Sequence, residues 1–457
     1  RSAWQTTMDA AQQHYQPGVF TSFIAYEWSA DAGDLTAHMH RNVIYRGTNV
    51  AELPFSSLDS HRPEDLWAFL EKQNQQGKTA FAIPHNANFS RGNMYAPRDS
   101  EGKALTAQYA EMRNRYEPVS EILQIKGSSE THPLLSSEDE FANFAILGES
   151  LFTGKETMET IKGSYTRDAL RVGMELSHSE GFNPFKFGVI GSSDSHNASS
   201  PSEENNYTGK LPMLDGSAGL RTDQALRLPE GINPVTRWGS GGLAAVWAEE
   251  NTRESIFDAL GRKETYATSG PRIALRFFSG WHFSAAMLKQ NNFIEQAYAG
   301  GVPMGGELLA GPKNQAPAFV IIAAKDPLGA NLDRVQIIKA WIDKNGKSHE
   351  RVYDVSAADE RRINPATGQL AEVGNTVDIK RAKYENSIGG AIISAHWVDP
   401  DFTPGQQAFY YARVLEIPTP RWSTYDAVTL GTEPMHPATI QERAISSAIW
   451  YMPTGSR

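Results

Sequence analysis

The first 275 residues of the chain alternate short apolar runs with segments of helical pattern. Strand-like runs rich in β-branched and aromatic residues lie at 20–26, 42–45, 79–83, 119–125 and 187–190. Helical patterns lie between them at 63–76 and 165–180, and another begins at Asn251 and Thr252. This alternation predicts an α/β domain whose strands are largely parallel.

The helix expected at 63–76 has clear start and stop signals. Pro63 suits a first helical turn because its fixed φ is already helical. Glu64 and Asp65 carry negative charge at the positive end of the helix dipole, and Gly77 follows the last periodic residue.

The pattern changes to strands alone after about residue 276. Strands are expected at 273–278, 319–324, 335–342, 351–355 and 409–417. Asn345-Gly346 predicts a type I′ hairpin turn, since this pair tolerates positive φ. We therefore divide the chain into an α/β domain at 1–275 and a β-rich, sandwich-like domain at 276–457. The long loops 209–242 and 291–317 are expected to be lids or binding segments.

Composition excludes several functional classes. A chain of 457 residues predicts two packed units. A net charge of −10 argues against a general nucleic-acid binder, which needs a basic surface. No apolar run approaches the length of a membrane span. Cysteine is absent, so a metal site would have to use His, Asp and Glu.

Five residues of the kinds that bind metals lie at the ends of predicted strands. They are Glu27, His40, His85, Asp194 and His196. A carboxylate with imidazoles suits Zn²⁺, Mn²⁺ or Fe²⁺. Each segment alone has a plainer interpretation: a strand-end His is more often structural, and Asp194-Ser195-His196 could be a simple turn. Their occurrence together favours a metal site.

Three further residues are candidates for catalysis. Lys126 lies at a strand end, where it could hold a substrate anion, or it could pair with Glu130 in a surface turn. His132 could be a metal ligand or a general acid. Arg41 could clamp an anion, although an Arg at a strand start more often pairs with a structural carboxylate.

The strand-end motifs together resemble those of the PHP (polymerase and histidinol phosphatase) superfamily. The resemblance is carried by Glu27 after a strand, by His40, by Pro84-His85-Asn86, and by Gly191-Ser-Ser-Asp194-Ser-His196. The segments FIAYEW, HRNVIYRG and FGVIGSSDSH are closest to a bacterial branch of unknown function. Residues 252–273 are also similar to the CehA/McbA-type metallohydrolases.

The resemblance implies a distorted (β/α)₇ barrel with an appended β-rich C-terminal domain, and two or three divalent metal ions (Zn, Mn or Fe). It implies that Glu27 is a bridging carboxylate, that His40 and His85 are the middle ligands, and that Asp194 and His196 are the final pair. His38 is left out because the family pattern centres on His40.

The sequence departs from the superfamily at its start. A first His-x-His and an Asp-His pair are absent, and the chain opens with Arg1 rather than Met. We expect these motifs to lie before residue 1 or in a companion chain. The resemblance also implies a periplasmic or secreted location.

Three functions are consistent with this pattern. The first is a metal-dependent hydrolase in which a metal-bound hydroxide attacks a small-molecule phosphate ester. The second is hydrolysis of a carboxylic or carbamate ester, as in the CehA/McbA type. The third is a non-catalytic, metal- or ligand-binding envelope protein. Metal content and ester turnover would separate them.

Overall fold

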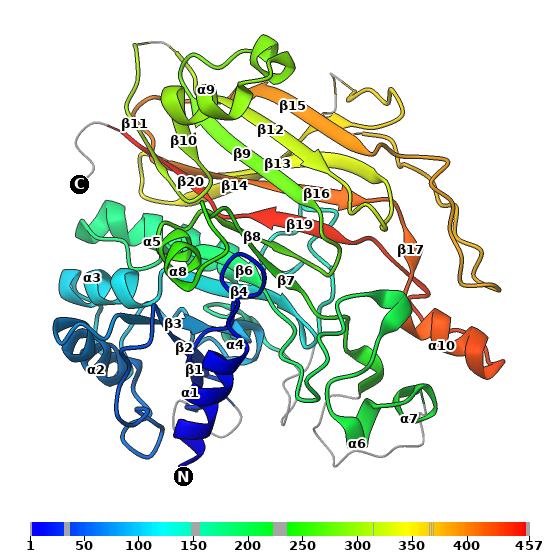
Figure 1. Cartoon of the computed structure of the whole chain (residues 1–457). Coiled ribbons are helices and arrows are strands. Elements are labelled where there is room, and N and C mark those ends of the chain that lie inside the picture. Colours follow the sequence, from blue (N-terminus) through cyan, green and yellow to red (C-terminus); the bar gives the residue numbers. More distant parts are fainter. Residues whose placement is uncertain are drawn as a thin grey trace.

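An eight-stranded sheet lies at the centre of the molecule (Figure 1). The computed structural model describes residues 2–31, 37–147, 156–222, 235–313, 315–364, 366, 368 and 370–453. The strands of this central sheet are β7 (Leu243–Val246), β8 (Thr265–Thr268), β11 (Glu307–Leu309), β13 (Leu332–Ile342), β14 (Ser348–Ala357), β16 (Ala408–Glu416), β19 (Arg443–Ser446) and β20 (Ile449–Met452).

Both faces of the central sheet are buried, and the strand sequences explain why. In β13, Val335 and Ile337 point into one hydrophobic core, whereas Ile338 and Ala340 point into another. Side chains alternate between the two faces of a strand, so a strand covered on both sides is apolar throughout.

A second, four-stranded antiparallel sheet packs on one face of the central sheet. It contains β9 (Ala274–Gly280), β10 (Gly301–Pro303), β12 (Ala318–Ala324) and β15 (Ile392–Val398). Helix α9 (Phe293–Gly300) covers its outer face through Phe293 and Ala297. The two sheets form a sandwich, which is the upper part of Figure 1.

The other face of the central sheet carries the α/β part of the chain. Helix α5 (Thr166–Glu180) packs there with β4 (Val119–Gln124) and β6 (Gly188–Gly191). These two strands are parallel, and β5 (Gly127–Ser128) pairs with β4. A separate antiparallel sheet contains β1 (Ala25–Trp28), β2 (Arg41–Tyr45) and β3 (Ala80–Pro84). Strand β3 lies beside β4, and β6 lies beside β8.

Helices cover the outside of the α/β part (Figure 1). Helices α2 (Pro63–Gln75) and α3 (Ala107–Tyr116) pack against β3, and α8 (Arg253–Gly261) adds Phe257 and Leu260 to a core with β2 and β3. The other α-helices and strands of the described residues are α1 (Ala3–Gln13), α4 (Met158–Ile161), α6 (Pro212–Asp215), α7 (Ala218–Thr222), α10 (Trp422–Leu430), β17 (Thr419–Pro420) and β18 (Thr439–Ile440).

The structure confirms a mixed α/β chain and most expected elements. The helices expected at 63–76 and 165–180 are α2 and α5, whereas the strand expected at 20–26 lies later in the chain, as β1 at Ala25–Trp28. The expectation of largely parallel strands is wrong: within the described residues, only β4–β6 and β11–β20 pair in parallel. No closed barrel is formed by the part of the chain that the structure describes.

The hairpin at Asn345-Gly346 is confirmed, but its turn type is not I′. Only Gly346 has a positive φ, of 79°, whereas a type I′ turn needs positive φ at both central residues. Gly346 donates its N–H to Asp343, and Asp343 donates to Lys347. A type I turn followed by a left-handed glycine satisfies these bonds.

The division predicted at residue 275 stays a prediction. Strands β7 and β8 precede that position, yet β8 pairs with β19 in the central sheet. The predicted loop 291–317 contains α9, β10 and β11. The loop 209–242 contains α6 and α7, and its residues 223–234 lie outside the described part of the chain.

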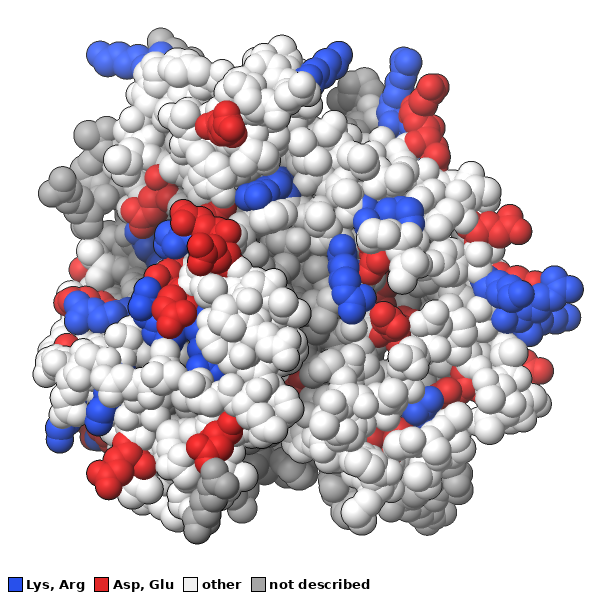
Figure 2. Space-filling view, in the orientation of Figure 1, with Lys and Arg blue, Asp and Glu red and all other residues white. Residues whose placement is uncertain are grey.

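Charges of both signs lie on the exterior. On the face shown in Figure 2, Lys and Arg side chains lie scattered among acidic and uncharged residues. Within the described ranges, no helix has the length and apolar character needed to cross a membrane.

Candidate functional site

Antiparallel pairing brings Glu27, His40 and His85 to one edge of the β1–β2–β3 sheet. Glu27 lies near the end of β1, His40 directly precedes β2, and His85 directly follows β3. Since β2 runs opposite to both neighbours, its start meets the ends of β1 and β3. The His85 N–H donates to the His40 carbonyl oxygen at 3.3 Å, which fixes the two segments side by side.

The three side chains converge on one carboxylate oxygen. Glu27 Oε1 lies 2.7 Å from His40 Nδ1 and 3.2 Å from His85 Nε2. One ligand atom from each residue lies within 4.8 Å of the others. His85 is buried, whereas Glu27 is partly open to solvent. We call Glu27, His40 and His85 the Glu-His-His group.

The electrostatics of this group keep the carboxylate ionised. Burial opposes the charge on Glu27, but the hydrogen bonds with His40 and His85 outweigh it and hold the pKa well below its usual range. An ionised carboxylate with two imidazole nitrogens is a donor set that suits Zn²⁺, Mn²⁺ or Fe²⁺. The residues present therefore fit a divalent metal ion.

His38 adjoins the Glu-His-His group, although it was not among the ligands predicted from the sequence. Its ring stacks on that of His40, with centroids 3.9 Å apart. Burial, reinforced by nearby Lys126, lowers the pKa of His38 to about 2, so the ring is neutral. Among the described residues, its Nδ1 is buried without a hydrogen-bond partner. The two-residue spacing in His38-Met39-His40 was a signal, since extended backbone directs alternate side chains to one side.

Asp194 is held by two lysines. Lys126 Nζ lies 2.6 Å from Asp194 Oδ2, and Lys210 Nζ lies 3.2 Å from Asp194 Oδ1. Burial opposes the charge on Asp194, but the lysines outweigh it and hold the pKa below its usual range. Burial and the neighbouring Lys126 lower the pKa of Lys210 to about 8.

His196 lies beside Lys210. Its Nδ1 is 2.8 Å from Lys210 Nζ, and about half of its side chain is exposed. Asp194, His196, Lys126 and Lys210 form what we call the lysine-aspartate group.

Asn86 connects the two groups. It follows His85, and its Nδ2 lies 3.4 Å from Asp194 Oδ2. Asn86 and Asp194 both have left-handed backbone, with φ of 55° and 52°. Asn and Asp tolerate this region better than other side-chain-bearing residues.

Gly191, three residues before Asp194, allows β6 to approach the central sheet. A Cβ at this position would lie 2.8 Å from the carbonyl oxygens of Leu243 and Thr268. Any other residue would push the Asp194 segment away from its neighbours.

The other predicted residues have different surroundings. Lys126 is buried beside Asp194, so its interpretation as a surface-turn partner of Glu130 is wrong. Arg41 forms a buried ion pair with Glu117, as in its structural alternative. His132 lies 3.3 Å from Glu156, and no contact of the described residues joins it to either group. The catalytic roles of Lys126, Arg41 and His132 and the metal-binding roles of Asp194 and His196 stay predictions.

Lys210 and Glu121 were not predicted from the sequence. Lys210 follows His196 by 14 residues in an irregular segment, so no local pattern pointed to it. Glu121 is a buried acid within β4; it accepts hydrogen bonds from Ser192 and Gln124, and burial raises its pKa. A charged residue inside an apolar run was the signal that could have identified it.

A comparison with protein families gives one match, to the family described as Protein of unknown function (DUF3604), over residues 1–453. The chain belongs to the DUF3604 family. This match covers nearly the whole chain, so both groups lie within the region that defines the family. The comparisons with curated proteins and with solved structures gave no match.

Proposed function

We propose that this DUF3604 protein is a metal-dependent hydrolase of phosphate esters. The observation that carries the proposal is the convergence of Glu27, His40 and His85 within 4.8 Å. Two or three Zn, Mn or Fe ions and a relation to the PHP superfamily, with its distorted barrel, are part of the same proposal.

The Glu-His-His group would hold the metal through one carboxylate oxygen and two ring nitrogens. A divalent ion bound there supplies an acidic water and polarises a phosphoryl oxygen. His85 Nε2 lies 3.2 Å from Glu27 Oε1. The other ring nitrogen, Nδ1, is buried and free of hydrogen-bond partners within the described residues. The partial exposure of Glu27 leaves the group open to a substrate.

The lysine-aspartate group supports a phosphate substrate over a neutral ester. Lys126 and Lys210 place two ammonium groups around one carboxylate, so this part of the site carries excess positive charge. Charge develops on oxygen during phosphoryl transfer, and fixed cations lower the energy of that transition state. Carboxylic or carbamate ester hydrolysis and non-catalytic metal binding remain the competing functions, and a periplasmic location is part of the proposal.

The test combines metal analysis with a substrate panel. We expect the purified protein to contain divalent metal and to hydrolyse p-nitrophenyl phosphate or bis-p-nitrophenyl phosphate faster than p-nitrophenyl acetate. Glu27→Gln should reduce metal content and rate together, because a neutral amide is a poor ligand for these ions. Bound metal without turnover of any ester would refute the hydrolase and favour a binding protein.

A further inference from the structure

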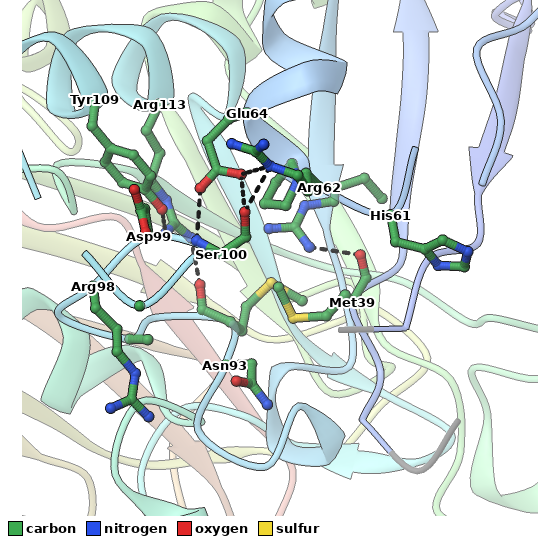
Figure 3. A pocket seen from close by; sticks show the side chains of 15 residues that line it. Met39, His61, Arg62, Glu64, Asn93, Arg98, Asp99, Ser100, Tyr109 and Arg113 are labelled. Carbon is green, nitrogen blue, oxygen red and sulfur yellow. Dashed lines mark hydrogen bonds and ion pairs between the residues drawn. The ribbon is translucent and has the colours of Figure 1, made fainter. Parts of the chain in front are cut away.

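A cavity of about 420 Å³ lies between the start of α2, helix α3 and the loop 93–102 (Figure 3). Four arginines line it: Arg41, Arg62, Arg98 and Arg113. Met39, Met94 and Tyr109 add apolar surface. This combination of a few charged groups with apolar walls is typical of small-molecule sites.

The cavity is separate from the Glu-His-His group, although the same segment lines both. Residues His38 and His40 stack on each other beside Glu27, whereas Met39 and Arg41 line the cavity. Alternate side chains of an extended segment point to opposite sides. The cavity therefore opens on the other side of this segment.

Buried charge at the cavity is unbalanced. Arg41 is 0% exposed and Arg113 is 2% exposed, and both contact the single carboxylate of Glu117, itself 2% exposed. Arg41 Nε lies 2.9 Å from Glu117 Oε1, and Arg113 Nε lies 3.3 Å from Glu117 Oε2. Two buried cations thus share one anion. A buried charge without a counterion is costly, so this excess predicts an anionic ligand.

The remaining contacts of the two arginines do not neutralise them. Arg41 Nη1 donates to the Met39 carbonyl oxygen, and Arg113 Nη2 donates to that of Met94. Arg41 Nη2 is buried and has no hydrogen-bond partner in the described part of the chain. An unused guanidinium donor is available for a ligand oxygen.

Two acids also line the cavity: Glu64, whose Oε2 lies 3.9 Å from Arg62 Nε, and Asp99. Within the described residues, neither forms an ion pair with Arg41 or Arg113. Glu64 accepts hydrogen bonds from Ser100, as the dashed lines in Figure 3 show. Asp99 accepts from the backbone N–H groups of Glu101 and Lys103. Helix α2 begins at the cavity with Pro63, so the positive end of its dipole adds to the attraction for an anion.

We propose that this cavity binds a small organic carboxylate with an apolar body. One excess buried charge matches a monoanion better than a phosphate monoester, which carries about −1.5 to −2 at neutral pH. The planar guanidinium presents paired N–H donors that fit a carboxylate, and the methionines and Tyr109 accommodate the apolar part. The proposal does not rest on the proposed hydrolase activity.

Titration calorimetry on the full chain in EDTA tests the proposal, with sodium benzoate, sodium acetate and inorganic phosphate as probes. Benzoate should bind most tightly, and about tenfold more tightly than phosphate. Arg41→Lys and Arg113→Lys keep the charge but remove the fork, so each should weaken benzoate binding about tenfold. Arg115 lies on α3, as Arg113 does, but it does not line the cavity. The control variant Arg115→Lys should therefore bind benzoate like the wild type.

A second variant keeps the test decisive if the buried substitutions unfold the protein. Arg98 is exposed, and its side chain has no hydrogen-bond or ion-pair partner within the described residues. Arg98→Glu should fold normally and weaken benzoate binding severalfold by reversing the charge at the rim. Glu27→Gln should leave binding unchanged, which separates this cavity from the metal site.

Three results would overturn the proposal. They are no benzoate binding to the wild type, tighter binding of phosphate than of benzoate, and benzoate binding that is lost in Glu27→Gln but kept in Arg98→Glu.

Discussion

The Glu-His-His group and the lysine-aspartate group lie side by side but satisfy their carboxylates differently. Glu27 is held by two imidazoles, which a metal ion can replace as partners without leaving a buried charge unpaired. Asp194 is held by two ammonium groups, which must move if Asp194 is to bind a metal. A carboxylate is therefore surrounded by possible metal ligands in one group and paired with cations in the other.

This difference has a consequence for metal binding. In the first group the partners of the carboxylate are imidazoles, which can themselves bind a metal, whereas in the second they are ammonium groups, which have no lone pair for a metal. We expect metal to bind first at the Glu-His-His group. The lysine-aspartate group would contribute to substrate binding and, if its lysines are displaced, to a second ion.

The largest expected effect is a difference between His85→Ala and Asp194→Ala. His85→Ala removes a ligand of the first group, so metal content should fall and phosphatase rate should drop about a hundredfold or more. Asp194→Ala should lower metal content less, because Asp194 is paired with lysines. Elemental analysis and initial rates measure both variants. Equal loss of metal in the two variants would show that the groups form one metal cluster.

An intermediate effect is expected from pH in the metal-free protein. Lys210 has a pKa of about 8 in the fold and 10.5 as its ordinary value. Its folded-state pKa is the lower one, so its stability contribution is present above 10.5 and is lost as pH falls to about 8. As pH rises across this window, the wild type should gain about 2 kcal/mol relative to Lys210→Met, which is less than the roughly 3 kcal/mol of the full shift because solvent partly screens the ammonium group.

Urea unfolding in EDTA at several pH values measures this difference. Lys72→Met, on α2, is the matched control and should follow the wild type. A difference between wild type and Lys210→Met that does not change with pH would contradict the assigned environment of Lys210.

The smallest effect is expected from Lys126→Ala. Removing one cation from the lysine-aspartate group should raise KM or lower kcat by about tenfold with metal content unchanged. Steady-state kinetics with a phosphate ester and elemental analysis measure both. Unchanged kinetics would leave Lys126 with only the structural role of pairing with Asp194.

The sequence was a good guide to element positions and a poor guide to how strands pair. Helix α2 was predicted from Pro63 and its acidic first turn because these signals are local. The direction of β1, β2 and β3 was predicted wrongly, since alternation of elements does not encode pairing. In the fold this antiparallel pairing is what joins Glu27, His40 and His85.

The candidate site was predicted only in part, because local patterns are visible in the sequence and contacts between distant residues are not. Positions at the ends of predicted strands identified Glu27, His40 and His85, because a ligand-type residue that directly precedes or follows an apolar run is visible in the sequence. Lys210 and the partnership of Arg41 with Glu117 were not visible, since the partners are far apart in the chain.

The sequence by itself determined that the chain has an α/β part and strand-rich segments, that any metal ligands are His, Asp or Glu, and which residues end the strands. These properties follow from composition and from patterns a few residues long. Only the tertiary structure decided that Asp194 faces two lysines and that Arg41 and Arg113 share Glu117. Such pairings arise where distant segments are packed together, and burial then determines which charges find a partner.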